Sequence, residues 1–145
     1  MNISLQPTVS LKTIFAPVRL FQLTEPFSGI IDGVDFKIPA GFVTDLASVP
    51  RVFESVVPND DPQILRPAIL HDWFYQSQGI PEGTAFWLTR AQADEVLREG
   101  MRVCGASCAK RWAVWAAVRV GGVWAWRNAL ARMLFMRFEL TSYRG

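Results

Sequence analysis

The hydrophobic pattern of the chain changes near residue 60, and this change limits the possible folds more than any other feature. Before it, apolar residues stand in short β-branched or aromatic runs between turn residues, such as 18–23 and 27–31. These runs are too short for helices and are typical of strands. After it, apolar residues recur at helical spacing. We therefore expect an α+β fold, in which an amino-terminal antiparallel β-hairpin region packs on three or four carboxy-terminal helices.

Length and composition place the chain in the size range of one globular domain. It has 145 residues, of which 50% are hydrophobic and 19% charged, and this excludes general disorder. The formal net charge of +2 is too small to indicate a nucleic-acid binder, so no specific nucleic-acid partner is expected. We expect a single domain over 1–145, mainly β and loops over 1–50 and mainly helical over 58–138.

Local signals position the expected elements. Asp32-Gly33 between two short apolar runs predicts a two-residue hairpin turn, and residues 42–50 predict a short extended piece that enters a loop. A helix is expected from about 62–66 to 77, with Pro67 in its first turn. A second is expected over 90–104 behind the Thr89/Gln92 capping box. Ser107 should cap a third, which Gly121-Gly122 should kink or break before a fourth over about 123–138.

The only histidine, His71, is followed by Asp72 and then by Tyr75 on the same predicted helix. Positions 71 and 75 of a helix lie one above the other, whereas position 72 is rotated by about 100°, so His71 and Asp72 should serve different partners. Asp94 falls in the middle of the next helix. If the two helices pack antiparallel, its carboxylate reaches the His71 ring and orients a general base. The alternative is that these side chains only tie two helices together.

Asp45 and Ser48 form a second polar group, in the segment after the hairpin. They suit a side-chain-to-backbone turn or a helix cap. In a functional interpretation, Asp45 joins Asp72 as a ligand of a hard metal ion, or Ser48 is a nucleophile beside His71. No Gly-x-Ser-x-Gly motif surrounds Ser48. We expect Asp45, His71, Asp72 and Asp94 to line a cleft.

Few residues bear on the compartment and on membranes. Two cysteines are too few for a disulfide scaffold, and the first seven residues lack a signal-peptide pattern, so synthesis in the cytoplasm is expected. Aromatic and basic residues crowd the last third, where a buried helix is one interpretation and an interfacial helix another. The peripheral membrane contact would involve four tryptophans: Trp112, Trp115, Trp124 and Trp126.

Three blocks of the sequence carry a resemblance to a known family. They are PAGFVTDLASVP over 39–50, HDWFY over 71–75, and Ala93-Asp94 with Met101. In order and spacing they resemble small, uncharacterised proteins encoded by tailed bacteriophages and prophages, over about residues 30–127. The resemblance implies a phage or prophage origin. With that origin, synthesis is expected in the host cytoplasm, and association with the virion is one alternative for the finished protein. It implies no established reaction.

The motif His-Asp-x-x-Tyr, with an Asp on the following helix, is also similar to the active site of phospholipase A(2) enzymes. This similarity implies that His71 is the base that activates water, Asp94 orients it and Tyr75 supports the pair. It also implies that Asp72 is a carboxylate ligand of Ca²⁺. The Gly-rich calcium loop of those enzymes is not recognisable in this chain.

Two functions from different classes follow as expectations. The first is a phage-encoded hydrolase directed at the cell envelope, specifically a Ca²⁺-dependent lipid esterase with a His–Asp dyad. The second is a non-enzymatic tail or virion assembly component, which contacts other phage structural proteins and in which the His–Asp pair is structural. Cleavage of peptidoglycan by a zinc enzyme is disfavoured, because a single histidine cannot supply the several His ligands of such sites.

Overall fold

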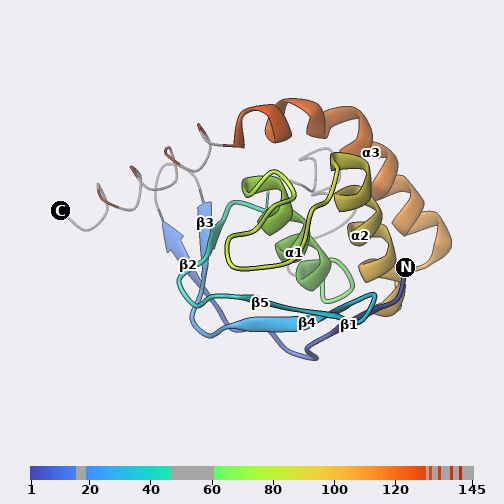
Figure 1. Cartoon of the computed structure of the whole chain (residues 1–145), viewed down its shortest axis with the longest axis horizontal. Helices are drawn as coiled ribbons and strands as arrows, with labels where there is room; N and C mark the ends of the chain where they lie inside the picture. Colours follow the sequence, from blue (N-terminus) through green and yellow to red (C-terminus); the bar gives the residue numbers. More distant parts are fainter. Residues whose placement is uncertain are drawn as a thin grey trace.

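Strands of the amino-terminal part form two small antiparallel sheets, seen in a computed structural model of the chain (Figure 1). The structure describes residues 1–15, 19–46 and 61–129, together with residues 131, 134, 138 and 141. One sheet has the strand order β1-β4-β5, built from Ile3–Leu5 (β1), Phe27–Ile31 (β4) and Val34–Ile38 (β5). The other has the order β2-β3-β6, built from Leu11–Phe15 (β2), Arg19–Leu23 (β3) and Val43–Thr44 (β6).

The predicted Asp32-Gly33 hairpin is confirmed. It joins β4 to β5, and Ile31 pairs with Val34 across it. Asp32 and Gly33 have φ values of 48° and 81°, the left-handed conformations that a two-residue turn between right-twisted strands requires. Of the extended piece expected over 42–50, Val43–Thr44 form β6, which pairs with β3, and residues 47–50 lie outside the described residues.

Three helices follow: Leu65–Gln76 (α1), Arg90–Val103 (α2) and Cys108–Arg127 (α3). Pro67 lies in the first turn of α1, where its missing N–H costs no helical hydrogen bond. The capping box of Thr89 and Gln92 starts α2, and the Ser107 side chain accepts a hydrogen bond from the backbone of Lys110 at the start of α3. These two caps confirm the predicted starts of the second and third helices.

The predicted break at Gly121-Gly122 is wrong, because α3 runs through both glycines to Arg127 and its C-cap is Asn128. Among the described residues that follow, 129, 131, 134, 138 and 141 are helical. The remainder of the fourth helix expected over 123–138 lies outside the described residues. No helix of the described ranges is long and apolar enough to cross a bilayer.

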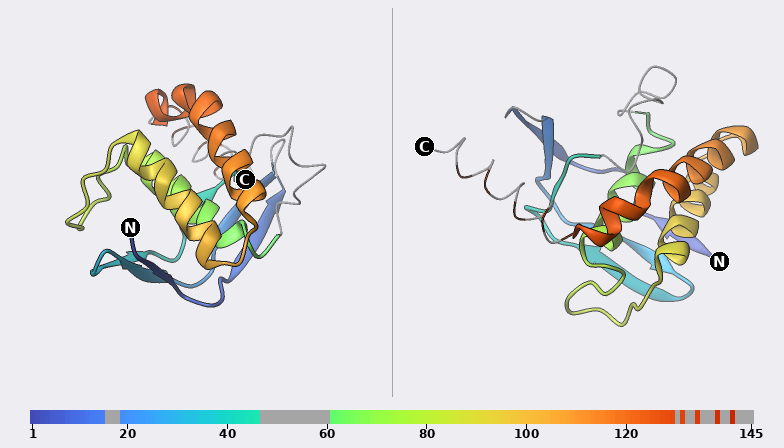
Figure 2. Two further views of the ribbon diagram at one scale, coloured as in Figure 1. Left: turned by 90° about the vertical axis from the view of Figure 1, so that its right-hand side faces the viewer. Right: turned by 90° about the horizontal axis from the view of Figure 1, so that it is seen from above.

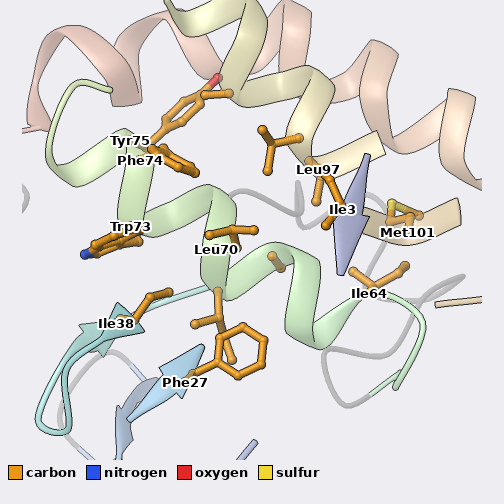
Figure 3. Close-up of a cluster of buried hydrophobic side chains, with 14 of the residues drawn as sticks. Ile3, Phe27, Ile38, Ile64, Leu70, Trp73, Phe74, Tyr75, Leu97 and Met101 are labelled. Carbon is orange, nitrogen blue, oxygen red and sulfur yellow. The ribbon is translucent and has the colours of Figure 1, made fainter. Parts of the chain in front are cut away.

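The helices stack in order on one face of the β1-β4-β5 sheet. Figures 1 and 2 show α1 and α2 above this sheet and α3 on the side of these helices away from it. Phe27 and Ile38 point from the sheet toward Leu70 of α1 (Figure 3), and all three are fully buried. Every residue of α1 from Pro67 to Tyr75 is buried, so this helix occupies the centre of the molecule. His71 and Asp72 belong to this buried stretch.

Candidate functional site

The carboxylate of Asp94 joins α2 to α1 through two hydrogen bonds. Its Oδ1 lies 2.8 Å from His71 Nε2 and accepts a second hydrogen bond, of 2.5 Å, from the Tyr75 hydroxyl. The His71 and Tyr75 rings stand one helical turn apart with their centroids 4.1 Å from each other. The expectation that Asp94 reaches His71 from the neighbouring helix is therefore met by the geometry.

The second oxygen of Asp94 faces two arginines. Arg119 of α3 donates to Oδ2 over 2.7 Å, and Arg90 of α2 lies 3.4 Å from the same atom. Arg90 also donates to the backbone carbonyls of Val118 and Arg119. Asp94 thus links all three helices, and the sequence analysis missed both arginines. The spacing of Arg90 and Asp94, four residues apart on one helix, was a usable signal, whereas nothing local marks Arg119.

Asp94 is held in its ionised form despite complete burial. Burial is the largest influence and raises the pKa of a carboxyl group, but hydrogen bonds from His71, Tyr75 and Arg119 outweigh it, so the pKa of Asp94 is lowered below its ordinary value. An ionised carboxylate only accepts hydrogen bonds, so the proton between the two groups sits on His71 Nε2. In neutral histidine, Nδ1 then carries a lone pair.

His71 Nδ1 is the unusual atom of the site. It is buried, and it has no hydrogen-bond partner within the described parts of the chain. Buried polar atoms almost always find a partner, so an unpaired one calls for an explanation, of which a catalytic role is one and a bound water or ion another. The ring thus has one nitrogen oriented by Asp94 and one nitrogen without a hydrogen-bond partner among the described residues.

Tyr75 is packed tightly between its neighbours. Burial, followed by its hydrogen bond to Asp94, raises the pKa of the Tyr75 phenol, so it stays a neutral donor. In Figure 3 its hydroxyl points away from α1 toward the other helices. A Cβ on Gly122 would lie 2.5 Å from that hydroxyl, and the Trp126 ring meets the Tyr75 ring edge-on at 5.1 Å. Gly122 therefore provides a close approach for Tyr75 rather than a helix break.

Asp72 turns to a different partner from His71, as the helical spacing predicts. Its Oδ2 accepts a hydrogen bond from the hydroxyl of Thr44, which in turn accepts one from the Leu46 backbone N–H at 3.0 Å. Half-buried Asp45 lies between these two residues in the chain. The segment after β6 is thereby attached to α1 beside the histidine, while the candidate nucleophile Ser48 lies outside the described residues.

The expected metal ligands form a partial set. Asp72 supplies one carboxylate next to His71, and Thr44 occupies one of its acceptor positions. Within 1–15, 19–46 and 61–129, no three side chains of the His, Cys, Asp and Glu types come together in a group that would hold a metal ion. Because Ca²⁺ takes six to eight oxygen ligands, an ion at Asp72 would need further oxygen ligands, such as main-chain carbonyls or water.

The expected cleft is not formed by these side chains. His71 and Asp94 are 0% exposed and Asp72 is 1% exposed, because α1 is covered by the sheet on one side and by α2 and α3 on the other. Hydrogen-bonded pairing makes the burial of these polar groups tolerable. The dyad is an internal network of the protein.

Comparison with known proteins identifies a family without a known activity. No curated protein and no solved structure matches the chain. A family described as "Protein of unknown function (DUF1353)" matches residues 21–118, a stretch that runs from β3 to α3 and includes His71, Asp72, Tyr75 and Asp94. The chain belongs to this DUF1353 family.

Proposed function

We propose that the protein is a hydrolase that cleaves an ester bond with the His71–Asp94 dyad. The observation that carries the proposal is the arrangement of the His71 ring: Nε2 is held 2.8 Å from the Asp94 carboxylate, and Nδ1 is buried with no hydrogen-bond partner among the described residues. A histidine with one nitrogen oriented by a carboxylate and the other available to a proton has the two features of a general base.

The proposed reaction uses both nitrogens of the His71 ring. Nδ1 takes a proton from a water molecule as the water oxygen attacks the ester carbonyl carbon. The imidazolium that forms is stabilised by the Asp94 carboxylate, which Tyr75 and Arg119 hold in place. When the carbon–oxygen bond to the leaving group breaks, Nδ1 returns the proton to the alkoxide, so the products are an acid and an alcohol and the base is restored.

The proposed substrate is a lipid ester of the cell envelope, in keeping with the resemblance to phage proteins and to phospholipase A(2) enzymes. We also propose a calcium ion, with Asp72 as one carboxylate ligand and Asp45 as a second. When bound there, it would polarise the ester carbonyl. Since Asp72 and Thr44 already share a hydrogen bond, the ion would have to share that carboxylate with the threonine hydroxyl. The reaction also requires an opening that admits water and substrate to the buried Nδ1.

Hydrolysis by the His71→Gln variant tests the base. We expect the rate of phospholipid ester hydrolysis to fall by about 10²–10⁴-fold, the usual contribution of a positioned general base. Far-ultraviolet circular dichroism checks that the variant is folded. A folded variant that keeps the wild-type rate would remove His71 from the reaction.

Calorimetry of calcium binding tests the metal ion independently of the catalytic base. Binding to the wild-type chain that disappears in a folded Asp72→Asn variant would support Asp72 as a ligand. Activity that is retained in the presence of a chelator would leave the dyad in place and remove calcium from the proposal.

The bonds of Asp94 to three helices support a second candidate, a non-enzymatic phage assembly component in which the pair is a structural link. This candidate predicts no hydrolysis, no calcium binding and a large fall in melting temperature for His71→Gln. The same set of measurements therefore discriminates between the two functions.

A further inference from the structure

The side of α3 that faces away from the rest of the molecule is apolar along its whole length. Figure 2 shows this helix at the edge of the structure, beyond α1 and α2. Its exposed residues form what we term the outer face: Cys108, Ala109, Trp112, Ala113, Ala116, Val120, Gly121, Val123, Trp124 and Arg127. Surface helices of globular proteins normally present charged and polar side chains to water, and Arg127 is the only charged member of this set.

Bulky side chains gather in the second half of the outer face. Val120 is 84% exposed and Trp124 is 66% exposed, and Val123 lies beside them at 36%. The first half carries small side chains together with Trp112, whose ring is covered on one side by the Arg98 guanidinium at 4.0 Å. A partner that binds α3 therefore buries the most apolar area at the carboxy-terminal half of this helix.

The other two candidate tryptophans face inward or sideways. Trp126 packs against Tyr75, and half-buried Trp115 contacts the Trp112 ring at 5.3 Å. The contact of Trp126 is with the buried Tyr75, whereas that of Trp115 is with Trp112 at the first half of the outer face. A contact surface on α3 thus depends on Val120, Val123 and Trp124, and not on all four tryptophans of the last third.

The charge of this region indicates the chemistry of the partner. From Gly105 to Phe138 the sequence contains no Asp or Glu, but it contains Lys110, Arg111, Arg119, Arg127, Arg132 and Arg137. Lys110 and Arg119 form ion pairs with Asp61 and Asp94, whereas Arg127 is exposed on the outer face. A second copy of the chain placed on the outer face would offer Arg127 no opposite charge, because the only charge on that face is positive. Anionic lipid headgroups supply the opposite charge, and tryptophan next to arginine is the composition that favours the boundary of a bilayer.

We propose that the carboxy-terminal half of the outer face of α3 docks on an anionic membrane surface. Val120, Val123 and Trp124 enter the boundary between headgroups and acyl chains, and Arg127 contacts the lipid phosphates. This surface is separate from the His71 site, and its binding is measurable whether or not the protein hydrolyses esters.

Sedimentation with lipid vesicles tests the proposal on the full chain. The probes are vesicles of phosphatidylcholine alone and vesicles that contain one third phosphatidylglycerol. We expect binding to the anionic vesicles, weakening as salt is added, and little binding to the neutral ones. Equal binding to both compositions, or binding to neither, would overturn the proposal.

Variants locate the surface. The double variant Val120→Ser/Trp124→Ser should raise the lipid concentration for half-maximal binding by about tenfold or more, because it removes the inserted apolar area. Trp87→Ser is the matched control, since Trp87 is 81% exposed on the loop before α2, and it should leave binding unchanged. An equal loss in the control would show that α3 is not the docking site.

A charge-reversal variant provides a second test of the surface in case the double variant does not fold. Arg127→Glu changes one exposed side chain at the end of α3 and should also weaken binding by about 25-fold, since the reversal amounts to two unit charges and each charge near an anionic surface contributes roughly fivefold. Light scattering coupled to gel filtration measures the oligomeric state and so tests whether a second copy of the chain binds the outer face instead. A wild-type dimer that the double variant converts to monomer, without vesicle binding, would assign the outer face to a second copy instead.

Discussion

At the scale of single residues, the site depends on how closely side chains approach one another. The Tyr75 hydroxyl reaches Asp94 only because residue 122 has no side chain, since a Cβ there would lie 2.5 Å from the hydroxyl and 3.2 Å from the ring. The neighbouring Gly121 is exposed, and a Cβ added to it would meet no contact within 4 Å. Two adjacent glycines of one helix therefore have different physical roles.

Alanine at each position should separate these roles. Gly122→Ala should lower the free energy of unfolding by about 1–3 kcal/mol, the usual cost of overpacking a buried contact. Gly121→Ala is the matched control and should raise it by about 0.5–1 kcal/mol, because alanine favours the helical conformation. Urea denaturation measures both. Tyr75→Phe removes the clashing oxygen and should reduce the cost of Gly122→Ala, and additive effects of the two substitutions would contradict the assigned contact.

At the scale of secondary structure elements, the arginines determine how α3 is held. Only Val114 and Val118 of α3 are fully buried, so apolar packing secures it less than it secures α1. Arg119 adds a charged hydrogen bond to Asp94 on α2, and Arg90 extends from α2 to the carbonyls of Val118 and Arg119. The same helix thus contributes to the site on one side and presents the outer face on the other.

Removing the Arg119 guanidinium should loosen α3 more than the remainder of the molecule. In Arg119→Gln, we expect amide hydrogens of α3 to exchange about 10–100 times faster, which corresponds to the loss of a hydrogen bond to a charged group. Arg127→Gln is the control, because Arg127 is exposed at the end of the same helix. Exchange that accelerates equally in α1 would indicate global destabilisation instead of a local role of Arg119.

At the scale of the whole molecule, one buried charge joins elements that are distant in the sequence. Asp94 is faced by His71, Tyr75, Arg90 and Arg119 from three helices. Because its pKa is lowered in the folded protein, the folded state favours the ionised form. The stabilisation is present above the pKa of an unfolded aspartate, about 3.9, and is lost as the pH falls through the lower folded value.

The stability of the whole chain should therefore decline in acid. We expect the free energy of unfolding of the wild-type protein to fall as the pH drops below about 4, and the slope to be smaller in Asp94→Asn. Burial raises the pKa of Asp61, but its hydrogen bond and ion pair with Lys110 outweigh this and lower the pKa below its ordinary value. The Asp61→Asn variant is therefore measured together with Asp94→Asn as a comparison. Thermal melts between about pH 2 and 6 give both slopes. An unchanged slope in Asp94→Asn would show that Asp94 does not titrate with folding.

The elements of the fold could be predicted from the amino-acid sequence, because their signals are local. Periodicity separates the strands from the helices, Asp32-Gly33 adopts the turn that its dihedral preferences allow, and Thr89 with Gln92 starts α2. The spacing of His71, Asp72 and Tyr75 also indicated correctly that the histidine and the first aspartate face different partners. Each of these inferences depends on residues within a few positions of one another, where backbone geometry is nearly fixed.

The contacts of the site residues and the depth of their burial depend instead on how the helices and the sheet pack together. Arg119 comes to Asp94 from 25 residues away, and the need for Gly122 depends on the position of the Tyr75 hydroxyl. No local rule encodes such approaches, because they arise only when three helices assemble. The expected cleft became a buried network for the same reason: burial is a property of the assembled layers, and α1 is enclosed by elements from both ends of the chain.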